Sequence, residues 1–195
     1  MDAPQPLDRA KIEEAFRLVG QYLLDRKTLG EIAIYGGSAI MMQFDWRKTS
    51  VDVDARVTSQ GNHGVIMDAV HDAAKRLGLP RSWLNENVTM YARRGERDSD
   101  RVFVGLYPSP ERFGLRVTAA RPEYMLAMKL RALERATADD HDYRDAIDLA
   151  LECEVNTIDD LRKTLQRFFG SDELPAFAEG RLASLIAAVR EKRRS

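Results

Sequence analysis

The first part of the chain alternates between helical and strand patterns of apolar residues. Residues 8–26 carry apolar side chains at helical spacing, and residues 64–77 repeat that pattern. Between these segments, residues 31–35 form a short apolar run typical of a buried strand, and residues 38–44 indicate a helix. Residues 51–57 alternate strictly, which predicts a strand whose core face carries Val51, Val53, Ala55 and Val57.

Further along the chain, strands are predicted at residues 101–106 and 114–118, and only helical patterns follow. These helices span residues 122–135, 140–153, 157–169 and 175–192. We therefore expect an α/β (α+β) fold with a small mixed β-sheet core flanked by helices in residues 1–120. A C-terminal helical bundle in residues 121–195 should pack on that core.

Composition narrows the classes of function only slightly. The chain has 195 residues, 44% of them hydrophobic and 31% charged, with a formal net charge of −1. This balance predicts a folded protein without the overall positive charge of many nucleic-acid binders. Two local basic runs, Arg93/Arg94/Arg97/Arg101 and the C-terminal run 190–194, are either solvated surface or RNA contacts.

The cysteine content and the apolar runs bear on the compartment. Cys153 is the single cysteine, so no internal disulfide framework is possible. No apolar stretch approaches the roughly 18 to 20 residues that cross a bilayer, and the first residues lack the pattern of a signal peptide. We expect a cytoplasmic protein without a membrane partner.

Two carboxylates project from the same face of the strand predicted at residues 51–57. Asp52 and Asp54 would have α-carbons roughly 6 to 7 Å apart, so both side chains can reach one hard cation, Mg²⁺ or Mn²⁺. Left alone, the pair would be mutually repulsive. The alternative is an exposed edge strand that points Asp52, Asp54 and Arg56 into water.

A glycine turn follows the strand predicted at residues 31–35. Gly36 and Gly37 end that strand, and Ser38 opens the next helix. Such a turn exposes backbone N–H groups at the positive end of a helix dipole, which suits a phosphate, and glycine lets that phosphate approach closely. The alternative is an ordinary tight turn capped by Ser38. Because a short helix returns the next strand beside the first, we expect the turn and the two aspartates to face one pocket.

These residues resemble a known family. Tyr35-Gly-Gly-Ser38 followed by Arg47-x-Thr49-x-x-Asp52-x-Asp54 is similar to the signature of the DNA polymerase β-like minimal nucleotidyltransferases. Within that superfamily the chain resembles the AbiEii-type toxins of abortive-infection and type IV toxin–antitoxin systems. The likeness continues in three later segments, Trp83-Leu-Asn-Glu-Asn-Val88, Pro122-Glu-Tyr-Met-Leu-Ala-Met-Lys129 and Asp142-Tyr-Arg-Asp145.

A lysine lies on the apolar side of the helix predicted from residue 122. Lys129 falls inside the arc of Met125, Leu126, Leu130 and Leu133, where an unpaired ammonium would be costly. Asp142 and Asp145, at positions i and i+3 of the next helix, are natural partners. The alternatives are a lysine that snorkels to the surface or a structural ion pair.

The resemblance implies a nucleotidyltransferase core in residues 1–120 and a function. It implies that Gly36, Gly37, Ser38, Arg47 and Thr49 bind the nucleotide, that Asp52 and Asp54 bind the metal, and that Lys129 contacts phosphate while Asp145 orients it or the acceptor. The implied partners are a nucleoside triphosphate, an RNA acceptor such as a transfer-RNA 3′ end, and a cognate antitoxin.

The chain departs from the family at one point. The strand predicted at residues 114–118 offers no third carboxylate, so Asp145 or Asp142 substitutes for it, or the protein is a weak or inactive nucleotide-binding or protein-interaction module of the same fold.

Overall fold

Two compact units make up the computed structural model, which describes residues 6–90, 92–93, 95–133, 140–171 and 176–194. Unit 1 comprises Met1–Tyr91 and Arg97–Ala120, and unit 2 comprises Ala92–Glu96 and Arg121–Ser195. The short segment Ala92–Glu96 groups with unit 2, where the hydroxyl of Tyr124 accepts a hydrogen bond from the backbone N–H of Arg93 at 2.8 Å.

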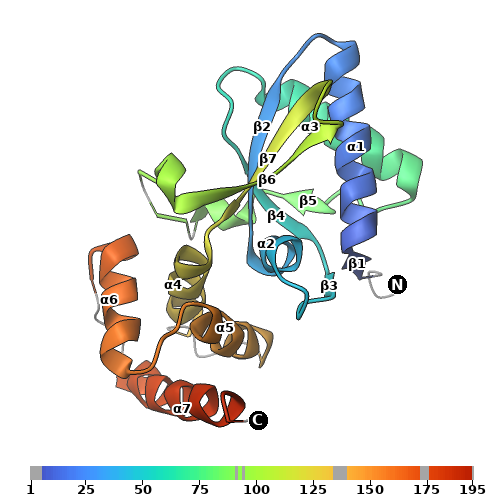
Figure 1. Cartoon of the computed structure of the whole chain (residues 1–195). Helices are drawn as coiled ribbons and strands as arrows, with labels where there is room; N and C mark the ends of the chain where they lie inside the picture. The colour runs from blue at the N-terminus through green and yellow to red at the C-terminus, as the bar shows by residue number, and fades with distance from the viewer. Residues whose placement is uncertain (1–5, 91, 94, 134–139, 172–175, 195) are drawn as a thin grey trace. The chain divides into compact units, whose positions relative to one another are not determined.

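Unit 1 is built on a five-stranded mixed sheet with strand order β5-β4-β2-β7-β6 (Figure 1). Its strands are β2 (Gly30–Tyr35), β4 (Val53–Val57), β5 (Leu84–Asn85), β6 (Arg101–Pro108) and β7 (Phe113–Ala120). The central strand β2 pairs antiparallel with β4 and parallel with β7. This sheet and the helices around it confirm the mixed α/β class predicted from the sequence.

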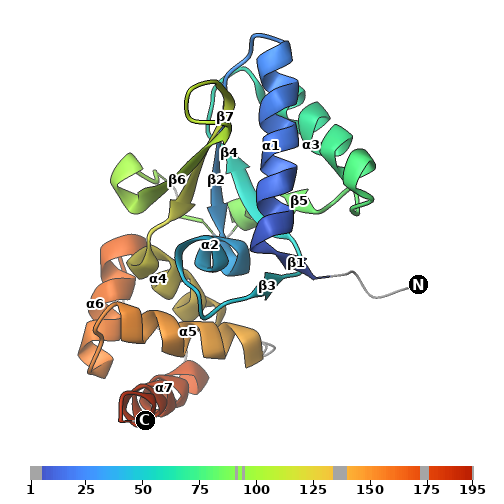
Figure 2. The ribbon, with the colours of Figure 1, turned by 45° about the vertical axis from the view of Figure 1, so that its right-hand side comes forward.

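Three helices and a second small sheet complete the regular structure described for unit 1. The helices are α1 (Arg9–Asp25), α2 (Gly36–Gln43) and α3 (His63–Leu77), with short 3₁₀ turns at Asn87–Met90 and Asp98–Asp100. Helices α1 and α3 lie side by side (Figure 2). Helix α1 buries all four apolar positions that predict it, whereas in α3 Ala69 and Ala73 are buried and Val65 and Leu77 are half-buried. Strand β1 (Leu7–Asp8) pairs antiparallel with β3 (Thr49–Ser50), and neither was predicted.

The strand predicted at residues 51–57 is shorter than expected. Val51 and Asp52 form a bend, and β4 begins at Val53, whose N–H donates to the carbonyl of Trp83 at 2.7 Å. Val51, expected on the core face, is 63% exposed. The reason is that the chain pairs with β1 up to Ser50 and must bend before it can join β2.

Helix α1 approaches the sheet closely because two glycines lie at the contact. A methyl group on Gly20 would lie 2.2 Å from the carbonyl oxygen of Tyr107 in β6, and one on Gly114 in β7 would lie 2.3 Å from the carbonyl oxygen of Gly20. These neighbours are backbone atoms, which cannot turn away as a side chain can. The spacing between α1 and the sheet therefore depends on both positions remaining glycine.

Unit 2 is helical throughout its described regular structure. Its helices are α4 (Pro122–Ala132), α5 (Asp140–Glu152), α6 (Ile158–Phe169) and α7 (Ala176–Lys192). Tyr124 of α4 is fully buried and stacks on Phe168 of α6 with ring centroids 5.1 Å apart. Thr157 and Asp160 form a reciprocal capping box that starts α6. The predicted helix ends at residues 134–135 and at residue 175 lie outside the described residues.

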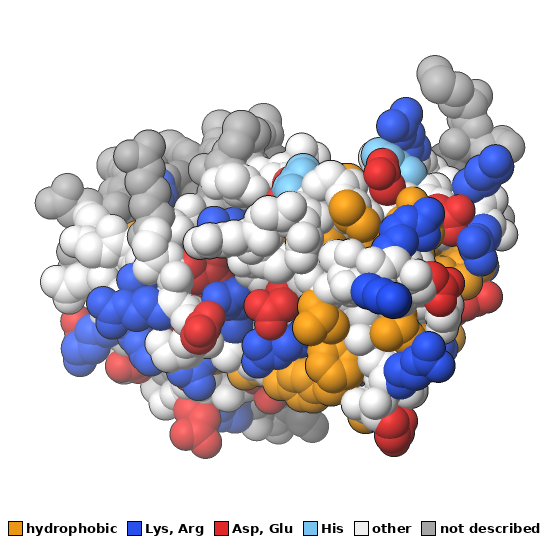
Figure 3. All heavy atoms as spheres, turned by 90° about the horizontal axis from the view of Figure 1, so that it is seen from above, with side chains coloured by type: hydrophobic (Ala, Val, Ile, Leu, Met, Phe, Trp, Pro, Cys, Tyr) orange, Lys and Arg blue, Asp and Glu red, His pale blue; other side chains and the backbone are white. Residues whose placement is uncertain are grey.

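Basic side chains of both runs form hydrogen bonds or ion pairs with residues of their own unit. Near the C-terminus, Arg190 donates to the backbone carbonyl of Asn156 at 3.2 Å, Arg193 donates to the Asn156 side chain, and Lys192 pairs with Asp148. In the other run, Arg101 pairs with Asp98, while Arg94 lies outside the described residues. Basic and acidic side chains are interspersed on the face drawn in Figure 3.

Within the described residues, no helix is both long enough and apolar enough to cross a membrane.

We predict that Gly20→Ala lowers the stability of unit 1, because its methyl group would overlap the backbone at Tyr107. Overpacking of this kind costs about 1 to 3 kcal/mol of unfolding free energy. Gly64→Ala, in α3 with no atom within 4 Å of the added methyl group, is the matched control. Urea denaturation measures both, and equal midpoints for the two variants would contradict the prediction.

Candidate functional site

The glycine turn and Asp54 lie together at one end of the central strand pair. Tyr35, the last residue of β2, pairs in register with Asp54 of β4. The next residue, Gly36, has a φ of +61°, and a methyl group there would lie 3.1 Å from Asp54 Oδ2. Glycine at this position therefore meets two requirements, a left-handed backbone conformation and room for a carboxylate.

Gly37 is bordered by a guanidinium and a hydroxyl group. A methyl group on Gly37 would lie 2.9 Å from Arg47 Nη2 and 3.0 Å from Ser50 Oγ. Arg47 Nε in turn donates to the carbonyl of Thr49 at 2.9 Å, which orients the guanidinium. Ser50 is buried, whereas Thr49, expected to bind nucleotide, is exposed. The hydroxyl group beside the turn is thus that of Ser50, for which the sequence predicts no role.

Ser38 contributes to the turn through its side chain. Helix α2 begins at Gly36, two residues earlier than predicted, and the backbone at Tyr35 occupies the cap position. The Ser38 hydroxyl is buried and donates to the carbonyl of Tyr35 at 3.0 Å. Ser38 therefore closes the first turn from inside and is not the cap residue that the alternative interpretation required.

Asp52 reaches a neighbouring strand from the bend that precedes β4. Asn85 Nδ2 of β5 donates to Asp52 Oδ2 at 2.8 Å. Burial raises the pKa of the half-buried Asp52 carboxyl above 3.8, and the hydrogen bond from Asn85 partly offsets this rise. A carboxylate that loses hydration in this way gains more from a nearby cation than an exposed one does.

The chemistry of this donor set is compatible with Mg²⁺. Proteins commonly hold this ion with one or two carboxylates and leave other positions to water and phosphate oxygens. Asp52 and Asp54 would supply the two carboxylates. Among the described residues, no group of three or more histidine, cysteine, aspartate or glutamate side chains gathers around one point. The described residues therefore do not form a metal site in which protein side chains alone supply all the ligands.

A second cluster lies in unit 2 and contains the other predicted site residues. Lys129 Nζ of α4 is 2.7 Å from Asp142 Oδ1 and 2.9 Å from Asp145 Oδ2 of α5. The Lys129 side chain is 14% exposed and that of Asp145 only 3%. Burial lowers the pKa of Lys129, but the charges of Asp145 and Asp142 outweigh this effect and raise it above 10.5. The ammonium is therefore charged at neutral pH, and it does not reach the surface by snorkelling.

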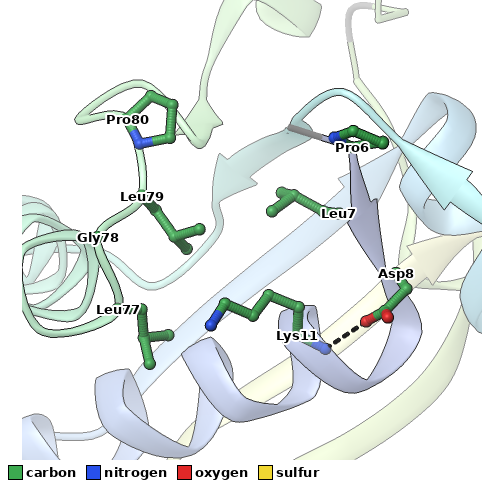
Figure 4. Close-up of a pocket in the computed structure, with 8 residues that line it drawn as sticks. All are labelled: Pro6, Leu7, Asp8, Lys11, Leu77, Gly78, Leu79 and Pro80. Atoms are coloured by element: carbon green, nitrogen blue, oxygen red, sulfur yellow. Dashed lines mark hydrogen bonds between the residues drawn. The ribbon is translucent and has the colours of Figure 1, made fainter. Parts of the chain in front are cut away.

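A hollow elsewhere in unit 1 has no part in either cluster. It has a volume of about 650 Å³ and lies between the start of α1 and the end of α3. Leu7 and Leu79 face each other across it, and Asp8 accepts a hydrogen bond from the backbone N–H of Lys11 beside it (Figure 4). Asp8 is the single acidic residue among those that line it, so the hollow offers no pair of acidic groups for a metal.

Comparison with known proteins gives one structural similarity. No family model matches the chain, and no curated protein is similar to it in sequence. The structure is similar to that of an antigenic nucleotidyltransferase-like protein from Paracoccidioides brasiliensis, with 15% identity over 94% of this chain and 95% of that one. The TM-score is 0.41, too low to support a statement about fold or activity.

We predict that the two glycines of the turn respond differently to alanine. Gly36→Ala forces a side chain into the left-handed region and should cost about 1 to 2 kcal/mol of unfolding free energy. Gly37→Ala meets only the movable ends of Arg47 and Ser50, and its higher helix propensity offsets the crowding, so its stability should stay within about 1 kcal/mol. Chemical denaturation measures the unfolding free energy of both variants. A larger loss of stability in Gly37→Ala than in Gly36→Ala would contradict the prediction.

Proposed function

We propose that this protein is a metal-dependent nucleotidyltransferase that transfers a nucleoside monophosphate from a nucleoside triphosphate to an acceptor hydroxyl. The acceptor oxygen forms a bond to the α-phosphorus, the bond from that phosphorus to the bridging oxygen breaks, and pyrophosphate leaves. The acceptor proton passes to an aspartate, for which we propose Asp145 or Asp142. In such reactions the protein mainly positions the reactants and stabilises charge.

One observation carries the proposal: the Asp54 carboxylate lies directly beside the glycine turn. Asp54 Oδ2 would be 3.1 Å from a methyl group on Gly36, and Arg47 borders the next glycine. An anion-binding turn and a cation-binding carboxylate at one place form the combination that a metal–triphosphate complex requires. The alternative of an exposed edge strand is wrong, because β4 lies between β5 and β2 in the sheet.

Within the proposal, each residue of unit 1 has a defined part. Asp52 and Asp54 bind Mg²⁺ or Mn²⁺, which would neutralise phosphate oxygens when bound. The backbone N–H groups at Gly36, Gly37 and Ser38 bind phosphate oxygens at the start of α2. Arg47 adds a guanidinium donor to the same anion. Ser50 takes the place proposed for Thr49 as the hydroxyl beside the turn.

The family resemblance assigns the remaining proposed roles to residues of unit 2. Lys129 would bind nucleotide phosphate, and Asp145 would orient Lys129 or the acceptor, as the resemblance implies. Their ion pair supports a prepared ammonium that is charged and held in one direction. The same contact also serves a purely structural pair, so nucleotide affinity is the property that distinguishes the two roles.

The proposed biological setting follows from the family resemblance. We propose RNA, in particular a transfer-RNA 3′ end, as the acceptor, growth inhibition as the consequence, and a cognate antitoxin protein as the partner. A cytoplasmic location fits these partners.

A second function is favoured by one specific feature. Strand β7, beside β2, carries no carboxylate in its sequence Phe-Gly-Leu-Arg-Val-Thr-Ala-Ala, and no third metal-binding side chain joins Asp52 and Asp54 among the described residues. A protein with this arrangement could bind nucleotide or a protein partner without turnover. The competing proposal is therefore a nucleotide-binding or protein-interaction module of the same fold.

We predict that Asp54→Asn abolishes nucleotidyl transfer while the protein stays folded, because it removes a metal-binding charge without changing the shape of the side chain. The assay combines purified protein, Mg²⁺, each α-labelled nucleoside triphosphate and total RNA, and follows label on RNA. Asp45→Asn is the matched control, since Asp45 is 93% exposed. Expression in bacteria adds a second readout: the wild type and the control should slow growth, and Asp54→Asn should not.

Two results would count against this enzyme. Substantial transfer by Asp54→Asn would remove Asp54 from the metal site. Absence of transfer in every wild-type reaction, together with retained nucleotide binding, would favour the module.

We predict that Lys129→Ala weakens binding of a nonhydrolysable nucleoside triphosphate analogue in Mg²⁺ by about tenfold to a hundredfold, the effect of losing a charged hydrogen bond. Titration calorimetry measures the affinity. Lys163→Ala is the control, because Lys163 forms an exposed pair with Asp159 on α6. A lower melting temperature with unchanged affinity would identify the Lys129 cluster as structural.

A further inference from the structure

The segment from Trp83 to Asn87 is fixed to unit 1 at its first residue. The indole Nε1 of the buried Trp83 donates to the carbonyl of Val70 in α3 at 3.1 Å. The Trp83 carbonyl accepts the N–H of Val53, the first residue of β4, at 2.7 Å. One residue thus ties this segment both to a helix and to the strand that carries Asp54.

A second anchor lies three residues further on. Glu86 Oε1 accepts the backbone N–H of Val57 at 3.2 Å, and Glu86 Oε2 lies 2.6 Å from His63 Nε2 at the start of α3. Trp83 and Glu86 thus each contact both β4 and α3, and the segment between them is held at both ends. Its middle residue, Asn85, has little freedom to change position.

The orientation of the Asn85 amide follows from its two partners. Asn85 Oδ1 accepts the backbone N–H of Asn87 at 3.0 Å, and a backbone N–H can only donate. The NH₂ group is consequently the part that faces Asp52, and it donates to Oδ2 at 2.8 Å. This hydrogen bond engages one oxygen of Asp52 from a fixed direction.

Asp52 needs such a partner more than Asp54 does. Asp54 lies within β4, where pairing with Tyr35 on one side and Asn85 on the other fixes its backbone. Asp52 lies in the bend before β4, outside any ladder. Partners that hydrogen-bond to metal-binding side chains orient them, and their loss typically weakens metal affinity by about 10- to 100-fold.

We propose that Asn85 is a positioning residue that holds the Asp52 carboxylate in its metal-binding orientation, with Trp83 and Glu86 anchoring the segment that carries it. This inference rests on the proposed metal site at Asp52 and Asp54. It gives the Trp83–Asn87 segment a task that the proposed reaction alone does not assign.

The test measures Mn²⁺ binding to the full chain by electron paramagnetic resonance, without nucleotide. Asn85→Ala should weaken binding by about 10- to 100-fold, and Asn85→Gln, which keeps the amide, should recover part of that loss. Asn87→Ala is the matched control, because Asn87 contacts Asn85 through its backbone N–H, which the substitution leaves in place. In the transfer assay, Asn85→Ala should raise the Mg²⁺ concentration for half-maximal rate and leave kcat at saturating Mg²⁺ within a few-fold.

The outcomes separate this inference from the proposed function. Wild-type affinity in Asn85→Ala, with binding lost in Asp54→Asn, would overturn the positioning role and leave the metal site in place. Equal binding by the wild type and Asp54→Asn would overturn both. A lower melting temperature of Asn85→Ala without weaker Mn²⁺ binding would make Asn85 purely structural. If Asn85→Ala does not fold, the Mn²⁺ affinity of Asn85→Gln is compared with that of Asn87→Ala. Weaker binding by Asn85→Gln would then support the positioning role, and equal binding would overturn it.

Discussion

The close approach of a carboxylate to a backbone turn is the constraint on which the candidate site depends. Because β2 and β4 run antiparallel, the end of one strand meets the beginning of the other, and Asp54 comes to lie opposite Tyr35. Glycine is strongly favoured after Tyr35, since the backbone there turns left-handed and the carboxylate occupies the adjoining space. The turn, the acid and the register of the sheet are thus one interdependent arrangement.

The positions of several neighbouring side chains follow from their contacts with the turn and with the strand that carries Asp54. Arg47 and Ser50 border the second glycine, and the bend that follows Ser50 brings Asp52 within reach of Asn85. Most of these side chains come from loops or strand ends, where the backbone alone would leave them freedom. Hydrogen bonds such as that from Arg47 to the Thr49 carbonyl supply the restraint that regular structure does not.

The sequence predicts the longer elements well, for a physical reason. A helix such as α1 buries Ile12, Phe16, Val19 and Leu23 over several turns, so its period is visible without any partner. Strands β1, β3 and β5 have two residues each, too few to show a period. The bend at Val51 is not predictable either, because the apolar and polar alternation of residues 51–57 continues through it and indicates one uninterrupted strand.

The candidate site is predictable where its residues are close in the chain. The glycine turn and the two aspartates form a local pattern, and Lys129 stands out as a charge on an apolar helix face. Thr49 belongs to the family signature, whereas the proximity of the Ser50 hydroxyl to the turn depends on the path of the backbone after Arg47 and is not visible in the sequence. The bond from Asn85 to Asp52 spans 33 positions, and no periodicity in one sequence reveals such a pairing.

The Lys129 cluster has a consequence for the thermodynamics of any ligand. One ammonium and two carboxylates sum to a formal charge of −1, and the pair Asp52 and Asp54 sums to −2. Neither group of side chains is attractive to a polyanion in isolation. Even with the guanidinium of Arg47 beside the turn, the formal charge around Asp52 and Asp54 is −1. If the proposed metal site exists, uptake of a polyanion there would be linked to uptake of a cation, and its apparent affinity would rise with the activity of divalent ions in solution.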